Sequence, residues 1–362
     1  MKNILYLLPV VFALLSCENP QQDNLNSHQN VSVEWNDANP GMVSSIVDDI
    51  KYIPIETHPD GLFSGSSPLK IILKNDRIFI FDKRRANAVL MFDINGRFLS
   101  KIGKRGGGPG EYNMLSSYTA DDDYIYLLDA SKSAVLVYDY DGNHVKDLKT
   151  PNRPMDIAVF ENGDFLLTNH PLIYGEENGP RLLITDNKLN IKNELFPINE
   201  TDSKLTMSPY FADLGDKISY QNYIQDTLVV FDKKTEEYKT YSFDFPHKVP
   251  LELRSGLDFR KGGYQYLSYI PALISGKYVI CTVSMKPFII DAETGALYKN
   301  DKNSLYGNGN TLYGDYIVFA FTGAHYKHVT ENGNWPRAPK EMDEFFMADD
   351  DNVGLILYKL KE

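Results

Sequence analysis

The sequence predicts an all-β fold, a six-bladed β-propeller made of four-stranded antiparallel blades. One phrase recurs along the chain: an apolar strand, a short turn, a second apolar strand that ends in Asp, and then a turn and a third strand. The turns are rich in Asp, Asn and Gly, and the 24 Tyr and 19 Phe favour strands over helices. A unit of this kind that repeats at a steady interval is typical of propeller blades.

The interval between repeats is nearly constant. The clearest copies are RIFIFDKRRANAVLMFDINGRFLSKIG and YIYLLDASKSAVLVYDYDGNHVKDLK. When the second Asp of each copy is aligned, successive copies lie 46, 47, 46 and 59 residues apart, and the longest interval contains an insertion at residues 246–264. A sixth copy is split by an insert at residues 324–351. The aligned residues are Asp93, Asp139, Asp186, Asp232 and Asp291.

The N-terminus, MKNILYLLPVVFALLSC, indicates export. One Lys precedes an apolar run that is too short to span a bilayer, which is typical of a secretory signal. The ending LLSC resembles the lipobox of bacterial lipoproteins, in which the signal is removed and the Cys is lipidated. We expect a signal peptide at residues 1–16, lipidation of Cys17, and anchoring in the cell envelope at the outer membrane. The alternative is an ordinary signal peptide with an incidental Cys.

The remaining chain is expected to form one domain. Residues 17–48 are polar and predict a flexible tether, and residues 49–362 hold all the repeats. The last repeat ends at Leu360 after its third strand, whereas residues 49–57 have strand character without a partner nearby. We expect this N-terminal strand to complete the last blade, which would close the ring and remove an open sheet edge.

A glycine cluster, KRGGGPGEY, follows the first blade. A phosphate-binding Walker loop requires GxxxxGK[ST] between a strand and a helix, and neither the Lys-Ser/Thr pair nor a following helix is present. Glycine permits positive φ angles and close backbone approach, and proline stiffens a crossing. The cluster therefore predicts a structural link between blades.

These motifs carry a family resemblance. The run from FDINGRFLSKIGKRGGGPGEY to YIYLLDASKSAVLVYDYDGN resembles the NHL-type repeat and, more closely, the six-bladed β-propeller lipoproteins of Bacteroidetes. Those proteins share a Gly-Pro-Gly-Glu-Phe/Tyr crossing after the first blade, and YIPIET and the lipobox also fit. The resemblance covers nearly the whole chain and is sharpest over residues 50–145. It implies a propeller fold and a location in the cell envelope.

Several function classes are disfavoured. A net charge of −12 and a pI near 5.1 argue against nucleic-acid binding. Cys281 is the one cysteine beyond Cys17, and its apolar strand predicts a buried, inert thiol. No GxSxG elbow occurs, and no motif calls for a cofactor. His325 and His328, with His170, match no zinc spacing, so we expect no metal site.

The expected ligand site lies where loops converge on one face. In a propeller, the loops that join the second strand to the third, and one blade to the next, share a face where ligands bind. There the sequence places cations suited to an anionic ligand such as a uronic acid or a peptide carboxylate, and aromatic rings that could stack on it. Solvated loop tips are the alternative. The candidates are Arg84, Arg85, Lys104, Arg105, Arg153, His170, Tyr174 and Trp335, with Arg181 and Lys286 on the same face.

Two hypotheses of function follow. The first is a binding or scaffolding lipoprotein that holds a glycan, a peptide or a partner protein on this face. The second is a lyase or hydrolase that acts on a glycan or peptide at the propeller axis, with His170, His325 and Arg153 as the first residues to test. Propellers host both kinds of function. The absence of a catalytic motif favours binding.

Overall fold

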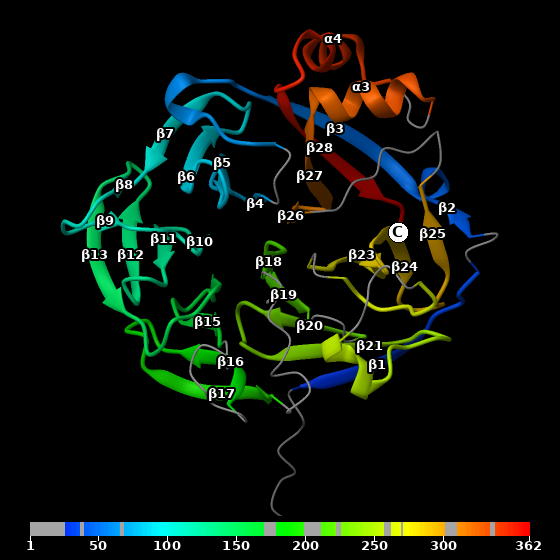
Figure 1. Ribbon diagram of the computed structural model, residues 1–362, viewed down its shortest axis with the longest axis horizontal. Helices are drawn as coiled ribbons and strands as arrows, with labels where there is room; N and C mark the ends of the chain where they lie inside the picture. The colour runs from blue at the N-terminus through cyan, green and yellow to red at the C-terminus, as the bar shows by residue number, and fades with distance from the viewer. Residues whose placement is uncertain are drawn as a thin grey trace, which may run out of the picture.

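Six β-sheets are arranged as blades around a central axis in the computed structural model (Figure 1). The structure describes residues 26–36, 40–65, 69–169, 179–198, 211–221, 226–256, 262–268, 271–300, 310–333 and 337–362. Every blade has a four-stranded antiparallel core, which confirms the predicted fold class.

In the first three blades, strands follow chain order from the axis to the rim. Blade 1 contains β4 (Leu69–Lys74), β5 (Arg77–Asp82), β6 (Ala88–Asp93) and β7 (Phe98–Ile102). Blade 2 contains β10 (Ser117–Ala120), β11 (Tyr124–Asp129), β12 (Ala134–Asp139) and β13 (His144–Lys149). Blade 3 contains β14 (Ile157–Val159), β15 (Phe165–Thr168), β16 (Pro180–Thr185) and β17 (Ile191–Pro197).

The other three blades each gain a strand from the N-terminal segment. Blade 4 contains β18 (Ala212–Asp213), β19 (Lys217–Gln221), β20 (Thr227–Asp232) and β21 (Tyr238–Asp244), and β1 (Ser27–Ser32) joins it. Blade 5 contains β22 (Leu273–Ser275), β23 (Tyr278–Val283), β24 (Lys286–Asp291) and β25 (Leu297–Lys299), and β2 (Gly41–Met42) joins it. Blade 6 contains β26 (Thr311–Tyr313), β27 (Tyr316–Thr322) and β28 (Val353–Leu360), and β3 (Val47–Ile55) completes it.

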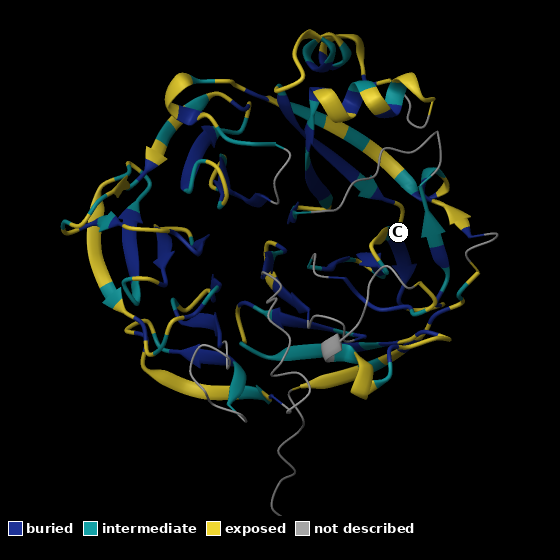
Figure 2. Cartoon of the chain, viewed as in Figure 1, coloured by how far each residue is buried: buried dark blue, intermediate teal, exposed yellow. Residues whose placement is uncertain are grey.

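Burial falls from the axis to the rim (Figure 2). The strands β5 and β6 are almost wholly buried, because blades pack face to face and both sides of a strand meet apolar neighbours. The outer strand β13 is exposed along most of its length. The two apolar strands of the repeated phrase therefore form the core between blades. The polar strand that follows them, the fourth strand of each blade, forms the rim.

The aligned Asp of each repeat organises the turn before the outer strand. Asp139 Oδ1 accepts hydrogen bonds from the backbone N–H groups of Asp141 and Asn143, at 3.0 and 2.8 Å. The side chain of Asn143 also donates to Asp139, and these hydrogen bonds hold the pKa of Asp139 below its usual value. The same kind of turn occurs at Asp93, Asp186, Asp232 and Asp291. The repeat in the sequence is thus a repeat of turn chemistry.

The N-terminal strand closes the ring. β3 pairs antiparallel with β28, with Ile55 opposite Val353 and Val47 opposite Leu360. In Figure 1 it runs along the outside of blade 6. The prediction that residues near 49–57 complete the last blade is confirmed, and the strand begins two residues earlier than expected.

The expected tether differs from the structure over residues 26–36 and 40–48. β1 pairs in parallel with β21, and β2 pairs in parallel with β25. Val31 and Val43 are 1% and 0% exposed, so these residues pack into the core of blades 4 and 5. With β3 they form an N-terminal belt, residues 26–36 and 40–55, around the outside of three blades (Figure 1).

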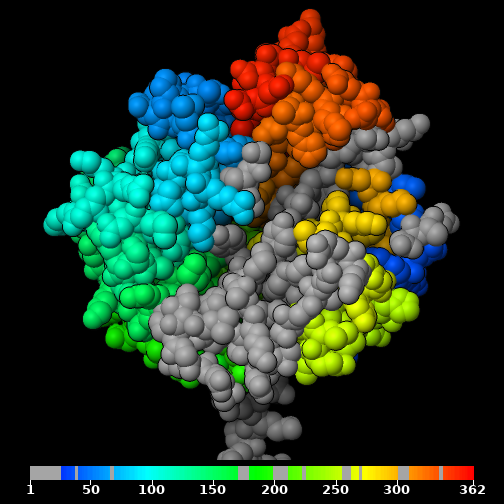
Figure 3. Space-filling model, viewed as in Figure 1, coloured from blue at the N-terminus to red at the C-terminus, as the bar shows by residue number. Residues whose placement is uncertain are grey.

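Two α-helices lie in the described residues, and both belong to the insert of blade 6. α3 (Gly323–Glu331) and α4 (Lys340–Ala348) project beyond the ring as an orange and red protrusion in Figure 3. The rings of Tyr326 and Phe346 stack 4.7 Å apart and attach the pair to the core. Neither helix is long and apolar enough to cross a membrane.

Candidate functional site

The two faces of the ring carry different connections. On one face, the first and second strands, and the third and fourth, are joined by turns of two to five residues. On the other face, strand ends are joined by the second-to-third connections and by the crossings between blades, whose described parts include residues 245–256, 262–268 and 323–333. We call these the tight-turn face and the loop-rich face. Long loops on a rigid scaffold are where binding groups concentrate, so the loop-rich face is the candidate site.

Arg84 and Arg85 lie in the turn between β5 and β6 on the loop-rich face. Their backbone N–H groups donate to Asp82 Oδ1 at 3.0 and 3.1 Å, and Asp82 is fully buried. Both arginine side chains are exposed. The buried carboxylate therefore fixes the turn, while the two guanidinium groups remain accessible to a ligand.

Lys104 and Arg105 are placed differently. They form β8 (Lys104–Arg105), which pairs in parallel with β9 (Glu111–Tyr112) at the outer edge of the ring (Figure 1). Glu111 accepts a hydrogen bond from the Gly108 N–H at 2.9 Å, and its carboxylate lies 3.7 Å from the Lys104 ammonium. The Gly108 hydrogen bond and the Lys104 charge hold the pKa of Glu111 below its usual value. The Glu111 carboxylate of the crossing itself thus occupies the glycine cluster and lies next to Lys104, which suits a structural link between blades.

The remaining candidates are spread over the ring. Arg153 is exposed in the crossing between β13 and β14, and Lys286 is exposed at the start of β24. Arg181 is half-buried in β16, where its carbonyl accepts a hydrogen bond from the Asn169 N–H. These three residues belong to other blades than Arg84 and Arg85. Cys17, His170, Tyr174 and Trp335 lie outside the described residues.

The histidine pair His325 and His328 lies on α3, in the protrusion beyond the ring. The ring of His325 stacks on Phe321 at 4.4 Å. Burial and the neighbouring His328 lower the pKa of His325. Across the described residues, no group of three His, Cys, Asp or Glu side chains is placed to hold a metal ion.

A buried ion pair near the axis was missed by sequence reasoning. Lys70 Nζ donates to Asp156 Oδ1 at 2.6 Å, to Ser117 Oγ at 3.0 Å and to the Ile157 carbonyl at 3.2 Å. Ser117 Oγ donates to the same Asp156 oxygen, and the Phe211 N–H donates to Asp156 Oδ2 at 2.5 Å. Lys70, Ser117 and Asp156 lie at the loop-rich ends of the inner strands of blades 1, 2 and 3.

This axial network is a clamp between blades. The three N–H protons of Lys70 have acceptors, and the side chains of Lys70 and Asp156 are only 8% and 1% exposed. A charge that is paired and hydrogen-bonded in this way is stable in the interior but is not available as a base or nucleophile. Burial also raises the pKa of the Cys281 thiol, so that thiol stays protonated and inert.

Unsatisfied polar atoms mark another part of the loop-rich face. Asp226 directly precedes β20, and Arg254 lies in the short helix η3 (Leu251–Gly256) of the crossing from blade 4 to blade 5. Within the described residues, Asp226 Oδ1 and Arg254 Nε are buried without a hydrogen-bond partner. Asn152 Oδ1, in the crossing from blade 2 to blade 3, is a third such atom. No sequence motif identifies these three atoms, because whether a polar atom is buried without a partner depends on the folded structure.

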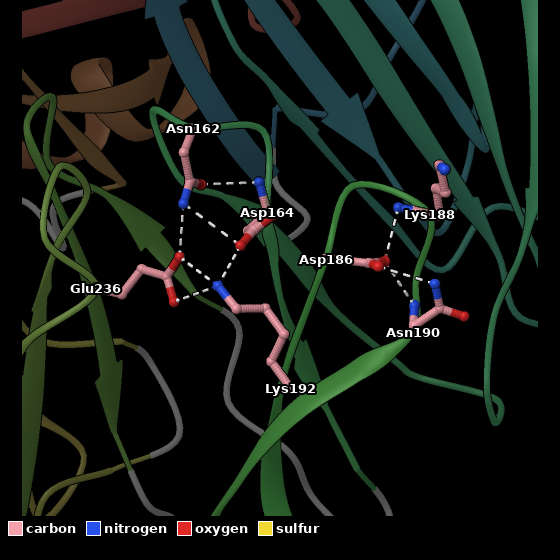
Figure 4. A network of polar contacts seen from close by, with 7 residues as sticks. All are labelled: Asn162, Asp164, Asp186, Lys188, Asn190, Lys192 and Glu236. Carbon is pink, nitrogen blue, oxygen red and sulfur yellow. Dashed lines mark hydrogen bonds and ion pairs between the residues drawn. The ribbon is translucent and has the colours of Figure 1, made fainter.

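The tight-turn face carries a network of ion pairs and hydrogen bonds (Figure 4). Lys192 forms an ion pair with Asp164 in its own blade and with Glu236 of blade 4, whose Oε1 lies 2.9 Å away. Asn162 donates to the same Glu236 oxygen at 2.7 Å. Hydrogen bonds to Asp164 and Glu236 raise the pKa of Lys192. The network links blades 3 and 4.

Comparison with known proteins supports the fold. A family model described as a domain of unknown function, DUF4934, matches residues 29–358. No curated protein matches the chain. Among solved structures, a protein of Bacteroides fragilis NCTC 9343 that is described as exported has a TM-score of 0.68 and 18% identity, covering 93% of this chain and 100% of its own.

Two further structures are more distant. A DUF4221 family member from Bacteroides vulgatus has a TM-score of 0.51 and 10% identity, over 88% of this chain and 98% of its own. Virginiamycin B lyase from Staphylococcus aureus has a TM-score of 0.44 and 13% identity, over 85% of this chain and 98% of its own. These identities show a shared fold alone, and the likeness to the lyase is too low to carry an argument about activity.

Proposed function

Since the chain belongs to the DUF4934 family and is built as a six-bladed propeller, we propose that it is a binding protein of the cell envelope whose loop-rich face holds a polar or anionic ligand. The observation that carries this proposal is the asymmetry of the two faces. Turns of two to five residues close the tight-turn face, whereas the loop-rich face has longer connections. Among the described residues, Asn152, Asp226 and Arg254 on the loop-rich face each have a buried side-chain atom without a hydrogen-bond partner. Such atoms cost free energy unless a ligand or water satisfies them.

The charge on the loop-rich face suits an anionic ligand. Arg84, Arg85, Arg153 and Lys286 are exposed there, although the chain as a whole is acidic. Arginine can bind a carboxylate through two parallel hydrogen bonds, which suits a uronic acid or a peptide carboxylate. The axial network offers no free base, and the two candidate histidines that the structure describes, His325 and His328, lie in the protrusion, so binding is favoured over catalysis.

Envelope anchoring is the second part of the proposal. The lipobox places a lipid on Cys17, and the described chain begins at Asn26, directly before the belt strand β1. The likeness to an exported Bacteroides protein supports export. Replacing Cys17 by Ser should move the protein from the membrane fraction to the soluble fraction. Unchanged retention in the membrane would contradict lipid anchoring.

A screen of glycans and peptides tests the binding role. The protein from residue 26 onward is presented to both ligand classes with and without a chelator. A polar or anionic ligand should bind, and charge reversal at Arg84 and Arg153 together should weaken its binding, with a steeper dependence on salt in the parent than in the variant. The matched control is charge reversal at Lys188 on the tight-turn face, which should leave binding unchanged. Equal effects of the two changes would contradict a binding site on the loop-rich face.

A further inference from the structure

Asp226 and Arg254 carry complementary groups that are both unsatisfied. Asp226 is 8% exposed, and its Oδ1 has no hydrogen-bond partner in the part of the chain that the structure describes. The Arg254 Nε–H is likewise buried and has no acceptor among the described residues. Leaving a buried donor and a buried acceptor unpaired costs about 1–3 kcal/mol each, more for charged groups, so both atoms favour a bound molecule that satisfies them.

Both residues lie at the loop-rich end of blade 4, Asp226 directly before β20 and Arg254 in the crossing that follows β21. The Asp226 carbonyl accepts a hydrogen bond from the Phe243 N–H at 2.8 Å, which holds Asp226 beside the end of β21. The chain leaves β21 at Asp244 and reaches η3 within seven residues, so Arg254 returns close enough to influence the charge on Asp226. Within the described part of the chain, no ion pair of 4 Å or less joins Arg254 to an acid.

The surrounding charges leave a positive site. Lys248 lies 3.0 Å from Asp244, so these two neighbours largely neutralise each other. Burial raises the pKa of Asp226 to about 6, and Asp244 adds to the rise, while Arg254 and Lys248 oppose it. Below that pH, Asp226 is mostly protonated and can donate a hydrogen bond, and the guanidinium of Arg254 carries the remaining positive charge.

We propose that Asp226 and Arg254 bind a carboxylate group of the ligand, whose oxygens accept hydrogen bonds from the Arg254 Nε–H and from the protonated Asp226 side chain. The proposal rests on the loop-rich face being the binding face. Two sources can supply this chemistry, a uronic acid and the C-terminus of a peptide. In either case, binding from neutral solution takes up one proton at Asp226, so affinity is linked to pH.

The size of the pH effect follows from the protonated fraction of Asp226. With a pKa of about 6, the donor form makes up most of the protein at pH 5.5 and only a few per cent at pH 7.5. Because apparent affinity scales with the competent fraction, binding should be roughly 20-fold tighter at pH 5.5. A uronic acid and a peptide carboxylate remain ionised at both pH values, since carboxyl groups of this kind titrate near or below about pH 4.

Calorimetric titration tests the proposal. Glucuronic acid and an N-acetylated tripeptide with a free C-terminus are compared with glucose and with the amidated tripeptide, at pH 5.5 and 7.5. One of the two carboxylates should bind tighter at pH 5.5 by roughly 20-fold, with uptake of one proton, and its uncharged counterpart should bind at least tenfold more weakly. The carboxylate that shows this behaviour identifies the source.

Three variants assign the effect. Asp226→Asn keeps a neutral donor, so it should bind at pH 7.5 as tightly as the parent binds at pH 5.5, and its affinity should not depend on pH. Arg254→Gln should lose at least tenfold at pH 5.5. Lys188→Gln removes an exposed cation from the tight-turn face and is the matched control, with less than a twofold change at both pH values. Circular dichroism and thermal melting check that each variant is folded.

The outcomes separate this proposal from the binding role itself. Equal affinity for a carboxylate and its uncharged counterpart, or a pH dependence that survives in Asp226→Asn, would overturn the carboxylate site. An uncharged ligand from the screen whose binding is weakened by charge reversal at Arg84 and Arg153 would support the binding role of the loop-rich face. It would contradict the carboxylate site at Asp226 and Arg254. Absence of binding by both carboxylates at pH 5.5 would also overturn it.

Discussion

Lys70 Nζ lies 2.6 Å from Asp156 Oδ1 and joins the inner strand of blade 1 to the entrance of blade 3. Both side chains are buried, and the Phe211 N–H extends the contact to blade 4. Ser117 of blade 2 also donates to Asp156, so four blades meet in this network of an ion pair and hydrogen bonds near the axis. Removing one partner would leave the other as a buried charge without compensation.

Replacing Lys70 by Met should lower the free energy of unfolding by about 3–5 kcal/mol, because Asp156 would lose its counterion in the interior. The measurement is urea denaturation at pH 7. The matched control is Lys340→Met, since Lys340 lies 3.8 Å from Glu344 with side chains 87% and 67% exposed. That change should cost at most about 1 kcal/mol. Similar losses in the two variants would contradict the clamp.

The belt strand β1 should contribute to stability through its buried valine. Val31→Ala should destabilise the protein by roughly 2 kcal/mol, because Val31 is 1% exposed and its removal leaves a cavity between β1 and the core. Val145 on the uncovered outer strand β13 is 46% exposed, and Val145→Ala should stay within about 0.5 kcal/mol. Thermal unfolding compares the two. If Val31→Ala left the melting temperature unchanged, β1 would not contribute to stability, and the expectation of a flexible tether would stand.

Asp226 should make stability fall as pH rises. Its folded pKa is raised, so the folded state holds the proton more tightly than the unfolded state, and stability is lost as pH rises from about 4 to about 6. Asp226→Asn removes this term. The variant should match the parent near pH 4 and exceed it by about 2–3 kcal/mol at pH 7. A difference between the two proteins that does not change with pH would contradict a raised pKa.

Gly110 should resist substitution in the crossing after blade 1. Its φ is +68°, and a Cβ there would lie 2.5 Å from the His144 ring. Gly110→Ala should therefore cost at least about 1 kcal/mol. Gly107, in the same cluster, has no atom within 4 Å of an added Cβ, so Gly107→Ala should stay within about 0.5 kcal/mol. Equal melting temperatures for both variants would show that the crossing tolerates change.

The fold was readable from the sequence because each repeat carries its own turn chemistry. Asp139 and its equivalents hold the turn before the outer strand by local hydrogen bonds, and local interactions leave a local pattern. The closing strand β3 was also predicted, since an incomplete last blade needs a partner. The strand β1, SHQNVS, was not predicted because Val31 is its one apolar residue. Its partner strand β21 lies more than two hundred residues away in the sequence.

The site was less readable. Lys70, Ser117 and Asp156 come from three blades, and no spacing in the sequence connects them. The unsatisfied state of Asp226 and Arg254 depends on burial, which a single sequence does not reveal. The exposure of Arg84 and Arg85 could be predicted because they lie in a short connection between two recognisable strands. Whether they lie close to cations of other blades depends on the path of each loop.

A loop-rich binding face is tested most directly by methyl NMR of three methionines with similar exposure. Met114 and Met285 lie on the loop-rich face, 57% and 49% exposed, whereas Met42 lies on the belt strand β2 at the rim and is 40% exposed. The protein is labelled at the methionine methyl groups and titrated at pH 5.5 with glucuronic acid and with the N-acetylated tripeptide. A ligand that binds the loop-rich face should shift the signal of Met285 or Met114 and leave that of Met42 unchanged. A shift confined to Met42 would contradict this placement of the site.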